Sequence, residues 1–271
     1  MDNKFIKIAK TAKDIATKQW KGLHNRKQVD VSDEQQKRIL AELDEKGYCV
    51  IEGYYDADQC QALCDEIDSL IDRYADSIWR DDKDSDNRIF GAEHLSDLIR
   101  PFHDDPLFKQ LADTYLKYET ENMHTLANRV QSRASNLGSG GGWHRDTVNE
   151  RQFKTIMYLN DVSETTGPFQ YMPGTHTLVS PIKHIYQNNV EHKQTRFTEE
   201  DIENIKASGE TVTTFTGQAG ILIIVDTSGI HRGAPIQQGT RYALTNYIYP
   251  KHLINDRMRA KFKPLVVKPN S

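Results

Sequence analysis

The chain has 271 residues, of which 37% are hydrophobic and 27% are charged, and its formal net charge is −4. This length allows one sizeable hydrophobic core, and the slightly acidic composition gives no reason to expect a nucleic acid as a partner. No apolar window is long enough for a membrane span and the N-terminus lacks an apolar signal segment, so we expect a cytoplasmic protein.

Residues 1–30 are predicted to form a basic, amphipathic helical extension. Its apolar residues recur at helical spacing and are Phe5, Ile8, Ala12, Ile15, Ala16, Trp20 and Leu23. Between them lie Lys4, Lys7, Lys10, Lys13, Lys18 and Lys21. Such a helix packs its apolar stripe on the protein body, which is the interpretation we favour, or makes weak contact with an anionic membrane surface. Residues 31–271 are predicted to form a single domain.

Helices and one short strand are predicted in the first half of that domain. Ser32 and Gln35 have the spacing of a capping box, and Gly47 is expected to end the helix that they begin. Further predictions are a strand over 48–51, a helix over 56–74, a charged loop over 80–88, and helices over 92–99 and 106–118. The cysteines Cys49, Cys60 and Cys64 lack zinc-site spacing and are interpreted as buried thiols.

The second half has the pattern of short antiparallel strands separated by turns. The predicted strands are 123–133, 153–160, 169–172, 211–215, 221–226 and 242–249. Residues 180–208 form a polar insertion with a helix start at Thr198, and we expect it to flank the mouth of a site. The fold class is therefore α+β with a mainly β core, a sandwich or barrel behind a helical cover.

The stretch Gly141-Gly142-Trp143-His144-Arg145-Asp146 contains a candidate metal site. On a strand, His144 and Asp146 would project from the same face and could reach one ion. Two histidines and one carboxylate form the facial triad of non-haem Fe(II) oxygenases, and His231, after an apolar strand, is the expected third ligand. Arg241 begins the next strand, where it could bind a carboxylate through two N–H groups.

These residues, together with the segment Gly167-Pro168-Phe169-Gln170-Tyr171-Met172-Pro173-Gly174-Thr175-His176, resemble the phytanoyl-CoA dioxygenase family of Fe(II)- and 2-oxoglutarate-dependent oxygenases. The resemblance implies a double-stranded β-helix, which is a distorted jelly roll. It implies that His144, Asp146 and His231 hold Fe(II) and that Arg241 binds the distal carboxylate of 2-oxoglutarate. It further implies use of O₂, release of succinate and CO₂, and hydroxylation of a substrate, for which we expect a small or medium polar metabolite.

Additional site residues are expected from the same resemblance. Gln131-Ser132-Arg133 resembles a run in ectoine hydroxylases, which implies that Gln131 contacts the cosubstrate and Arg133 the substrate, unless this run is only the edge of a polar barrel interior. Many relatives have a hydroxyl residue two positions after the distal histidine or the arginine, where this chain has Gly233 and Ala243. Ser135 and Thr155 are the candidates to replace that hydroxyl.

The functions of several neighbouring residues depend on packing. Trp143 is a candidate substrate contact, or else part of the barrel wall. The glycines at 138 and 140–142 are expected to form a flexible lip beside the pocket. His176 is interpreted as structural, and His184, His192 and His252 as surface residues.

Two other functions stay open at the level of sequence. One is α-hydroxylation of an acyl-CoA, which would need a basic groove near the site. The other is a non-catalytic metal-binding barrel that acts as a sensor or scaffold. Substrate identity and oligomeric state do not follow from the sequence.

Overall fold

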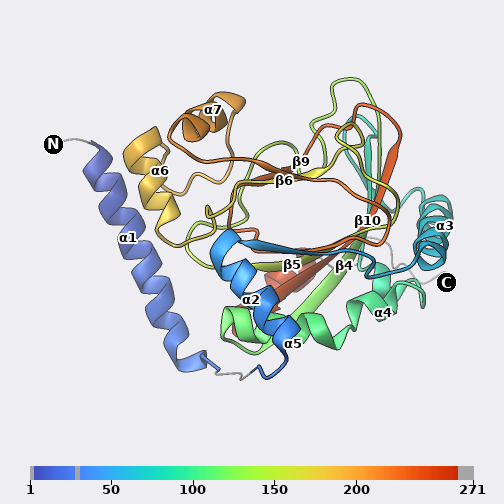
Figure 1. Ribbon diagram of the computed structural model, residues 1–271, viewed down its shortest axis with the longest axis horizontal. Helices are drawn as coiled ribbons and strands as arrows, with labels where there is room; N and C mark the ends of the chain where they lie inside the picture. Colours follow the sequence, from blue (N-terminus) through green and yellow to red (C-terminus); the bar gives the residue numbers. More distant parts are fainter. Residues whose placement is uncertain (1–2, 28–30, 262–271) are drawn as a thin grey trace.

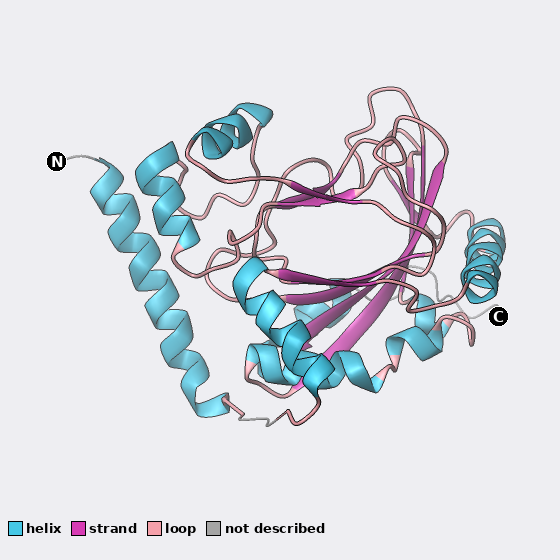
Figure 2. Ribbon diagram, in the orientation of Figure 1, coloured by secondary structure: helices cyan, strands magenta, loops and turns pink. Residues whose placement is uncertain are grey.

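The computed structural model describes residues 3–27 and 31–261. In this part of the chain, two antiparallel sheets face each other, and helices cover the outer face of the larger sheet (Figures 1 and 2). The predicted α+β class with a mainly β core is therefore confirmed. The predicted division at residue 30 falls on residues 28–30, which lie outside the described residues.

The strands agree closely with the sequence pattern. In spatial order, the larger sheet contains β1 (Tyr48–Ile51), β8 (Leu222–Val225), β5 (Phe153–Tyr158), β10 (Thr240–Pro250), β4 (Thr120–Gln131), β3 (Asp86–Phe90) and β2 (Trp79–Arg80). The smaller sheet contains β7 (Thr213–Phe215), β6 (Phe169–Tyr171) and β9 (His231–Gly233). The predicted loop over 80–88 is partly wrong, because residues 86–88 pair with β4 as the start of β3.

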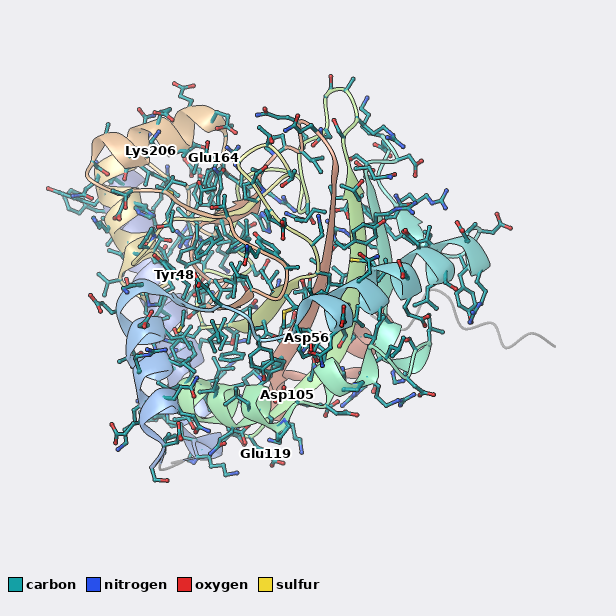
Figure 3. All side chains as sticks on the ribbon, turned by 45° about the vertical axis from the view of Figure 1, so that its right-hand side comes forward. Tyr48, Asp56, Asp105, Glu119, Glu164 and Lys206 are labelled. Carbon is teal, nitrogen blue, oxygen red and sulfur yellow. The ribbon has the colours of Figure 1, made fainter. Side chains whose placement is uncertain are left out.

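The helices are α1 (Asn3–Gly22), α2 (Glu34–Lys46), α3 (Ala57–Arg73), α4 (Arg100–His103), α5 (Pro106–Leu116), α6 (Ser180–Asn188), α7 (Glu199–Ala207) and α8 (Asp256–Lys261), with 3-10 turns η1 (Leu23–Asn25), η2 (Ala92–His94) and η3 (Lys251–Leu253). The helix predicted over 92–99 is wrong, since only η2 forms there and α4 begins at Arg100. Asp56 and Asp105 precede α3 and α5 (Figure 3), and each side chain accepts a hydrogen bond from a backbone N–H of the first turn. The N-cap of α2 is Asp33 rather than Ser32.

Period-two alternation divides each central strand between two hydrophobic clusters. On β5, Phe153 and Met157 face α2, α3 and α5, whereas Ile156 and Tyr158 face the smaller sheet. Strand β8 alternates in the same way, with Leu222 and Ile224 facing the helices and Ile223 and Val225 facing the smaller sheet. The buried thiols of Cys49, Cys60 and Cys64 are free, in agreement with their interpretation as core residues.

The insertion after β6 forms α6 and α7, which close a third hydrophobic cluster over one end of the sandwich. His184 on α6 is fully buried there, so its prediction as a surface residue is wrong. Its Nδ1 accepts a hydrogen bond from Nη2 of buried Arg145, 3.2 Å away. Thus α6 and α7 are part of the folded body. No helix in the described part of the chain is long and apolar enough to cross a membrane.

Candidate metal and cosubstrate site

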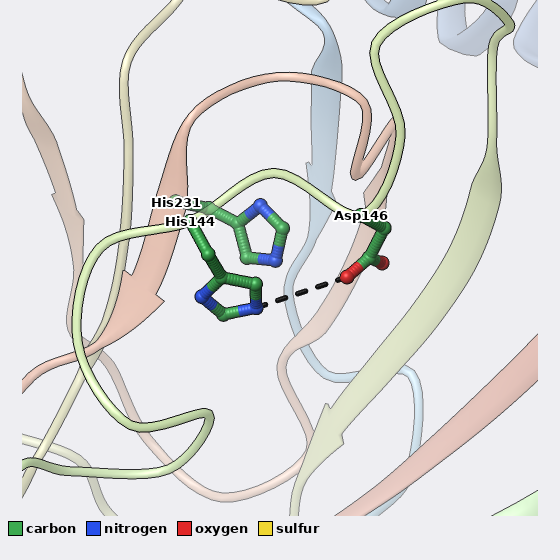
Figure 4. A group of neighbouring side chains, drawn as sticks. All are labelled: His144, Asp146 and His231. Carbon is green, nitrogen blue, oxygen red and sulfur yellow. Dashed lines mark ion pairs between the residues drawn. The ribbon is translucent and has the colours of Figure 1, made fainter. Parts of the chain in front are cut away.

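Three side chains from two distant segments converge at one end of the sandwich (Figure 4). His144 and Asp146 lie in the connection between β4 and β5, and His231 begins β9. Reciprocal backbone hydrogen bonds join His144 to His231, with N···O distances of 2.8 and 2.7 Å. Each of the three side chains has one atom that could coordinate a metal ion, and these three atoms lie within 4.8 Å of one another. The backbone pairing therefore brings together the ligand set that the sequence suggested.

Each of the two imidazoles makes a hydrogen bond that leaves one ring nitrogen available for a metal. Nδ1 of His144 lies 2.9 Å from the carbonyl oxygen of Gly142, and Nδ1 of His231 lies 2.9 Å from that of Gly229. A carbonyl oxygen can only accept, so each Nδ1 must carry the proton, and each Nε2 keeps its lone pair for a metal. Burial lowers the pKa of both rings, that of His231 to about 3, so both are neutral at pH 7.

Asp146 is held between the histidines and a buried lysine. Its Oδ1 lies 3.7 Å from Nε2 of His144, and its Oδ2 lies 2.6 Å from Nζ of Lys154 on β5. Burial opposes ionisation of this carboxyl, but the combined effect of Lys154, His231 and His144 outweighs burial and holds the pKa of Asp146 below its usual range. Burial would likewise lower the pKa of Lys154, yet Asp146 raises it. One carboxylate oxygen thus faces the histidines while the other is fixed by a cation.

A cavity of about 690 Å³ opens beside the three ligands. Its volume lies within the range of small-molecule sites. Its deep wall is formed by the inward faces of β4, β5 and β10, which contribute Leu126, Asn128, Lys154, Ile156, Tyr158, Arg241, Ala243, Thr245 and Tyr247. Its other lining residues include Trp79, Asp81, Asp82, Lys83, Leu137 and Arg196, together with the glycines at 138, 140 and 141. The glycine segment and part of the insertion therefore border the cavity, as the sequence suggested.

Arg241 projects into this cavity from the start of β10 and is buried. Its Nη1 donates a hydrogen bond to the carbonyl oxygen of Gly167. Its Nε is buried and has no hydrogen-bond partner among the residues that the structure describes. A permanent cation with an unpaired buried donor is stabilised by an anion, so Arg241 fits the distal carboxylate of a 2-oxo acid.

The structure separates the remaining predicted site residues into two groups. Ser135 lines the cavity, in a left-handed conformation with φ of 59°. Thr155 lies on β5 between Lys154 and Ile156, so its side chain projects from the opposite face, toward the helices. The sequence pattern could not assign it to a face, because it did not specify which alternate set points inward.

The register of β4 places Gln131 on the face of the strand that points away from the cavity. In β4 the inward residues are Leu126 and Asn128, so Gln131, three residues after Asn128, projects from the outer face. Arg133 follows the strand and is exposed, with its Nη1 donating to the carbonyl oxygen of Ser132. The resemblance to the ectoine hydroxylase run therefore does not bring these two side chains to the site.

Trp143 is a wall residue rather than a cavity residue. Its indole is buried in the cluster beneath α6 and α7, and the guanidinium of Arg232 lies 4.4 Å from the centre of the ring. Since successive residues alternate in an extended segment, the inward position of His144 directs Trp143 the other way. Buried His176 has a structural contact to the carbonyl oxygen of Asp44, in agreement with its interpretation.

Most of the wall residues of the cavity were not identified from the sequence, among them Lys154, Asn128 and Tyr158. Lys154 had a usable signal, because a lysine inside a predicted central strand is rarely buried without a charged partner. Asn128 Nδ2 donates to Asp86 Oδ1 at 3.2 Å, and Tyr158 Oη donates to the carbonyl oxygen of Phe215. Both add polar groups to a wall that also contains Lys154, Arg241 and Thr245.

The phytanoyl-CoA dioxygenase (PhyH) family model matches residues 43–241, which include every ligand of the site and most of both sheets. The chain belongs to this family. No curated protein gives a significant match. The family membership supports an oxygenase-type enzyme, and it leaves the reaction and the substrate undetermined.

Three solved structures of similar fold are distant from this chain in sequence. The epimerase SnoN, crystallised with Fe³⁺, α-ketoglutarate and nogalamycin RO, is 17% identical with a TM-score of 0.61 over 79% of this chain and 83% of its own. EctD from S. alaskensis, with bound iron, is 18% identical with a TM-score of 0.60 over 83% and 80%. HygX from Streptomyces hygroscopicus, with nickel, 2-oxoglutarate and hygromycin B, is 14% identical with a TM-score of 0.56 over 79% and 87%.

These matches confirm the predicted fold, which is the distorted jelly roll of iron- and 2-oxoglutarate-dependent oxygenases. They also agree with the predicted cofactors, since such relatives were crystallised with iron and 2-oxoglutarate and this chain has a His-Asp-His site of the same type.

Proposed function

We propose that the chain is an Fe(II)- and 2-oxoglutarate-dependent dioxygenase that hydroxylates a small or medium polar metabolite. The observation that carries this proposal is the arrangement of one cavity, in which three neutral or anionic metal ligands lie beside a buried arginine with an unpaired donor. Metal-ligand chemistry and carboxylate recognition are the two requirements of a 2-oxoglutarate site, and each is met by different side chains.

His144, Asp146 and His231 would hold the iron, with Arg241 binding the distal carboxylate of the cosubstrate. When bound, iron and 2-oxoglutarate supply the activation of O₂, with succinate and CO₂ as by-products. The protein contributes the geometry: the carbonyls of Gly142 and Gly229 keep both Nε2 atoms free, and Lys154 orients the carboxylate of Asp146.

The lining of the cavity supports a polar substrate. Asp86 accepts hydrogen bonds from Arg88 and Asn128, so a charged and hydrogen-bonded cluster borders the cavity. The α-hydroxylation of an acyl-CoA would require a cationic groove for the CoA phosphates. The cations that line this cavity are accompanied by Asp81, Asp82, Asp86 and Asp146, and Arg88 and Lys154 are paired with Asp86 and Asp146. The lining is therefore not a strongly cationic groove, which favours a metabolite without several phosphates.

The deciding experiment measures succinate formed from 2-oxoglutarate in air with added Fe(II), across a panel of polar metabolites. We expect turnover stimulated by a subset of the panel, with no turnover for His144→Ala. Incorporation of an oxygen atom from ¹⁸O₂ into the product distinguishes hydroxylation from desaturation or ring closure. Metal binding by the wild-type protein without any succinate above the His144→Ala background would instead favour the sensor or scaffold function.

A further inference from the structure

Helix α1 contacts the body through a mixed face, on which Ile8 and Ile15 lie among polar side chains. Lys7 Nζ lies 2.5 Å from Glu191, Thr11 Oγ1 lies 2.9 Å from His192 Nδ1, and Asp14 Oδ2 lies 3.0 Å from Lys193 Nζ. These partners belong to the segment between α6 and α7. Lys18 Nζ adds a contact to Glu150 at 3.3 Å. Thr11 and Ile15 are buried where the helix contacts the body.

The opposite face of α1 is also largely apolar, and it is exposed, whereas an amphipathic helix usually buries its apolar residues. The side chains of Phe5 and Trp20 are 65% and 73% exposed. At 100° per residue, the exposed residues that share their side of the helix fall within an arc of about 80°. We call this the apolar strip, and it consists of Phe5, Ala9, Ala12, Ala16 and Trp20, with Leu23 of η1 following the end of the helix. The expectation that the apolar stripe packs on the body therefore holds for Ile8 and Ile15. It is wrong for the exposed members of the stripe, which are Phe5, Ala12, Ala16, Trp20 and Leu23.

Positive charge follows the edge of the apolar strip that faces away from the body. Lys10, Lys13 and Lys21 are all exposed and fall within the next 100° or so of the helical wheel. The whole helix contains six lysines and one aspartate in a chain whose net charge is −4. Basic charge is thus concentrated on the element that exposes the apolar strip.

We propose that α1 is a docking surface for an anionic lipid bilayer, on which the helix lies in the plane of the interface. A helix of 20 residues is about 30 Å long, so Phe5 and Trp20 could anchor its two ends while the alanines allow close approach. The row of lysines complements anionic headgroups. An aromatic residue with a polar edge, such as Trp20, is well suited to the level of the headgroups.

Two observations favour a bilayer over protein occupants. A two-fold dimer through α1 would place two helices with the same strongly positive charge against each other, which opposes association. Protein interfaces are depleted in lysine at their centre, whereas the apolar strip is bordered along its length by lysines. A bilayer accepts both the apolar side chains and the lysines without requiring a shaped partner.

The test is co-sedimentation of the full chain with vesicles of phosphatidylcholine alone or with about a third phosphatidylglycerol. We expect binding to the anionic vesicles and a shift of tryptophan emission to shorter wavelength that Trp20→Phe removes. The double variant Phe5→Ala/Trp20→Ala is expected to bind at least about ten-fold more weakly. The triple variant Lys10→Gln/Lys13→Gln/Lys21→Gln is expected to lose the preference for anionic lipid.

Leu98→Ala provides the matched control, because Leu98 is 55% exposed outside α1, and this variant should bind like the wild type. Equal binding to neutral and anionic vesicles, an equal loss in Leu98→Ala, or no binding at all would overturn the proposal. A dimer in sedimentation velocity that the double variant abolishes, without vesicle binding, would assign the apolar strip to a second copy of the chain. Far-UV circular dichroism of each variant checks that α1 remains folded.

Discussion

At the scale of single residues, the distinguishing feature of the site is Lys154. A cation 2.6 Å from a metal-binding carboxylate can act in two opposed ways. It can orient the carboxylate and strengthen the site, or it can compete with the metal for the same negative charge. The geometry favours orientation, because Lys154 contacts Oδ2 of Asp146 whereas Oδ1 faces His144.

We therefore predict that Lys154→Met weakens metal binding about 10- to 100-fold, the usual effect of removing a group that orients a metal ligand. Equilibrium dialysis with Co(II), which requires no turnover, measures this affinity. Lys154→Arg keeps the charge and is expected to retain most of the affinity. Tighter binding by Lys154→Met would show that the lysine mainly competes with the metal.

A second prediction at this scale concerns Arg241. Arg241→Leu would remove the charge-assisted contact that we propose to the cosubstrate carboxylate. Loss of such a contact costs about 1.5–3 kcal/mol, which corresponds to roughly a 10- to 150-fold higher 2-oxoglutarate requirement. The concentration dependence of succinate formation measures the change. Metal affinity should stay as in the wild type, because Arg241 is not one of the metal ligands. An unchanged 2-oxoglutarate dependence would mean that another residue binds the cosubstrate.

At the scale of elements, the turn from α2 to β1 connects the helical cover to the site. Gly47 ends α2 with a left-handed φ of 88°, and its carbonyl oxygen accepts the backbone N–H of Asp226 at 2.8 Å. Asp226 follows β8, and its own carbonyl oxygen accepts the hydroxyl of Tyr171. Next in the chain, the carbonyl oxygen of Thr227 accepts the N–H of the metal ligand Asp146 at 2.9 Å.

This arrangement predicts that Gly47→Ala destabilises the fold by about 2 kcal/mol or more. The added Cβ would enter a left-handed conformation and collide with the hydroxyl of Tyr171 and, at 2.6 Å, with Nδ1 of His176. Gly53→Ala is the matched control, since Gly53 has φ of 61° with nothing within 4 Å of the added atom, and it should cost only about 1–2 kcal/mol. Urea unfolding measures both variants, and equal costs would exclude the collision as the cause.

The elements also show where sequence patterns succeed. Strands and helices were predicted well where apolar residues form a continuous run, as in β8, or recur on one face, as in α3. Strand β9 is only three residues long and contains no apolar residue, so it has no periodicity to detect. Residues 86–88 look like part of a charged loop, but Asp86 is buried beside Arg88 and Asn128. Their strand character depends on partners that are distant in the chain.

At the scale of the whole molecule, buried histidines couple stability to pH. Burial lowers the pKa of His184 to about 3, with Arg145 adding to the effect, and burial lowers that of His124 to about 3 as well. Each ring is neutral in the folded protein, whereas in the unfolded chain it binds a proton near pH 6.5. The stability that they contribute is therefore present above pH 6.5 and is lost progressively as the pH falls toward 3.

We predict that the free energy of unfolding falls between pH 6.5 and 3, by up to about 1.4 kcal/mol per pH unit for each of these histidines. Urea unfolding at a series of pH values measures this slope. His184→Gln keeps a neutral polar side chain next to Arg145. It should reduce the slope of the free energy of unfolding against pH by up to the contribution of one proton, about 1.4 kcal/mol per pH unit. A slope identical to that of the wild type would show that His184 is protonated in the folded state.

The sequence by itself determined the class of the fold and predicted the chemistry of the proposed site. The ligand types and the order of His144, Asp146, His231 and Arg241 follow from local patterns, because side-chain chemistry and period-two alternation are properties of a few neighbouring residues. Only the tertiary structure decided that Asn128 rather than Gln131 faces the cavity, that Lys154 pairs with Asp146, and that α1 exposes its apolar strip. Each of these depends on strand register or on the packing of segments far apart in the chain, which local periodicity does not encode.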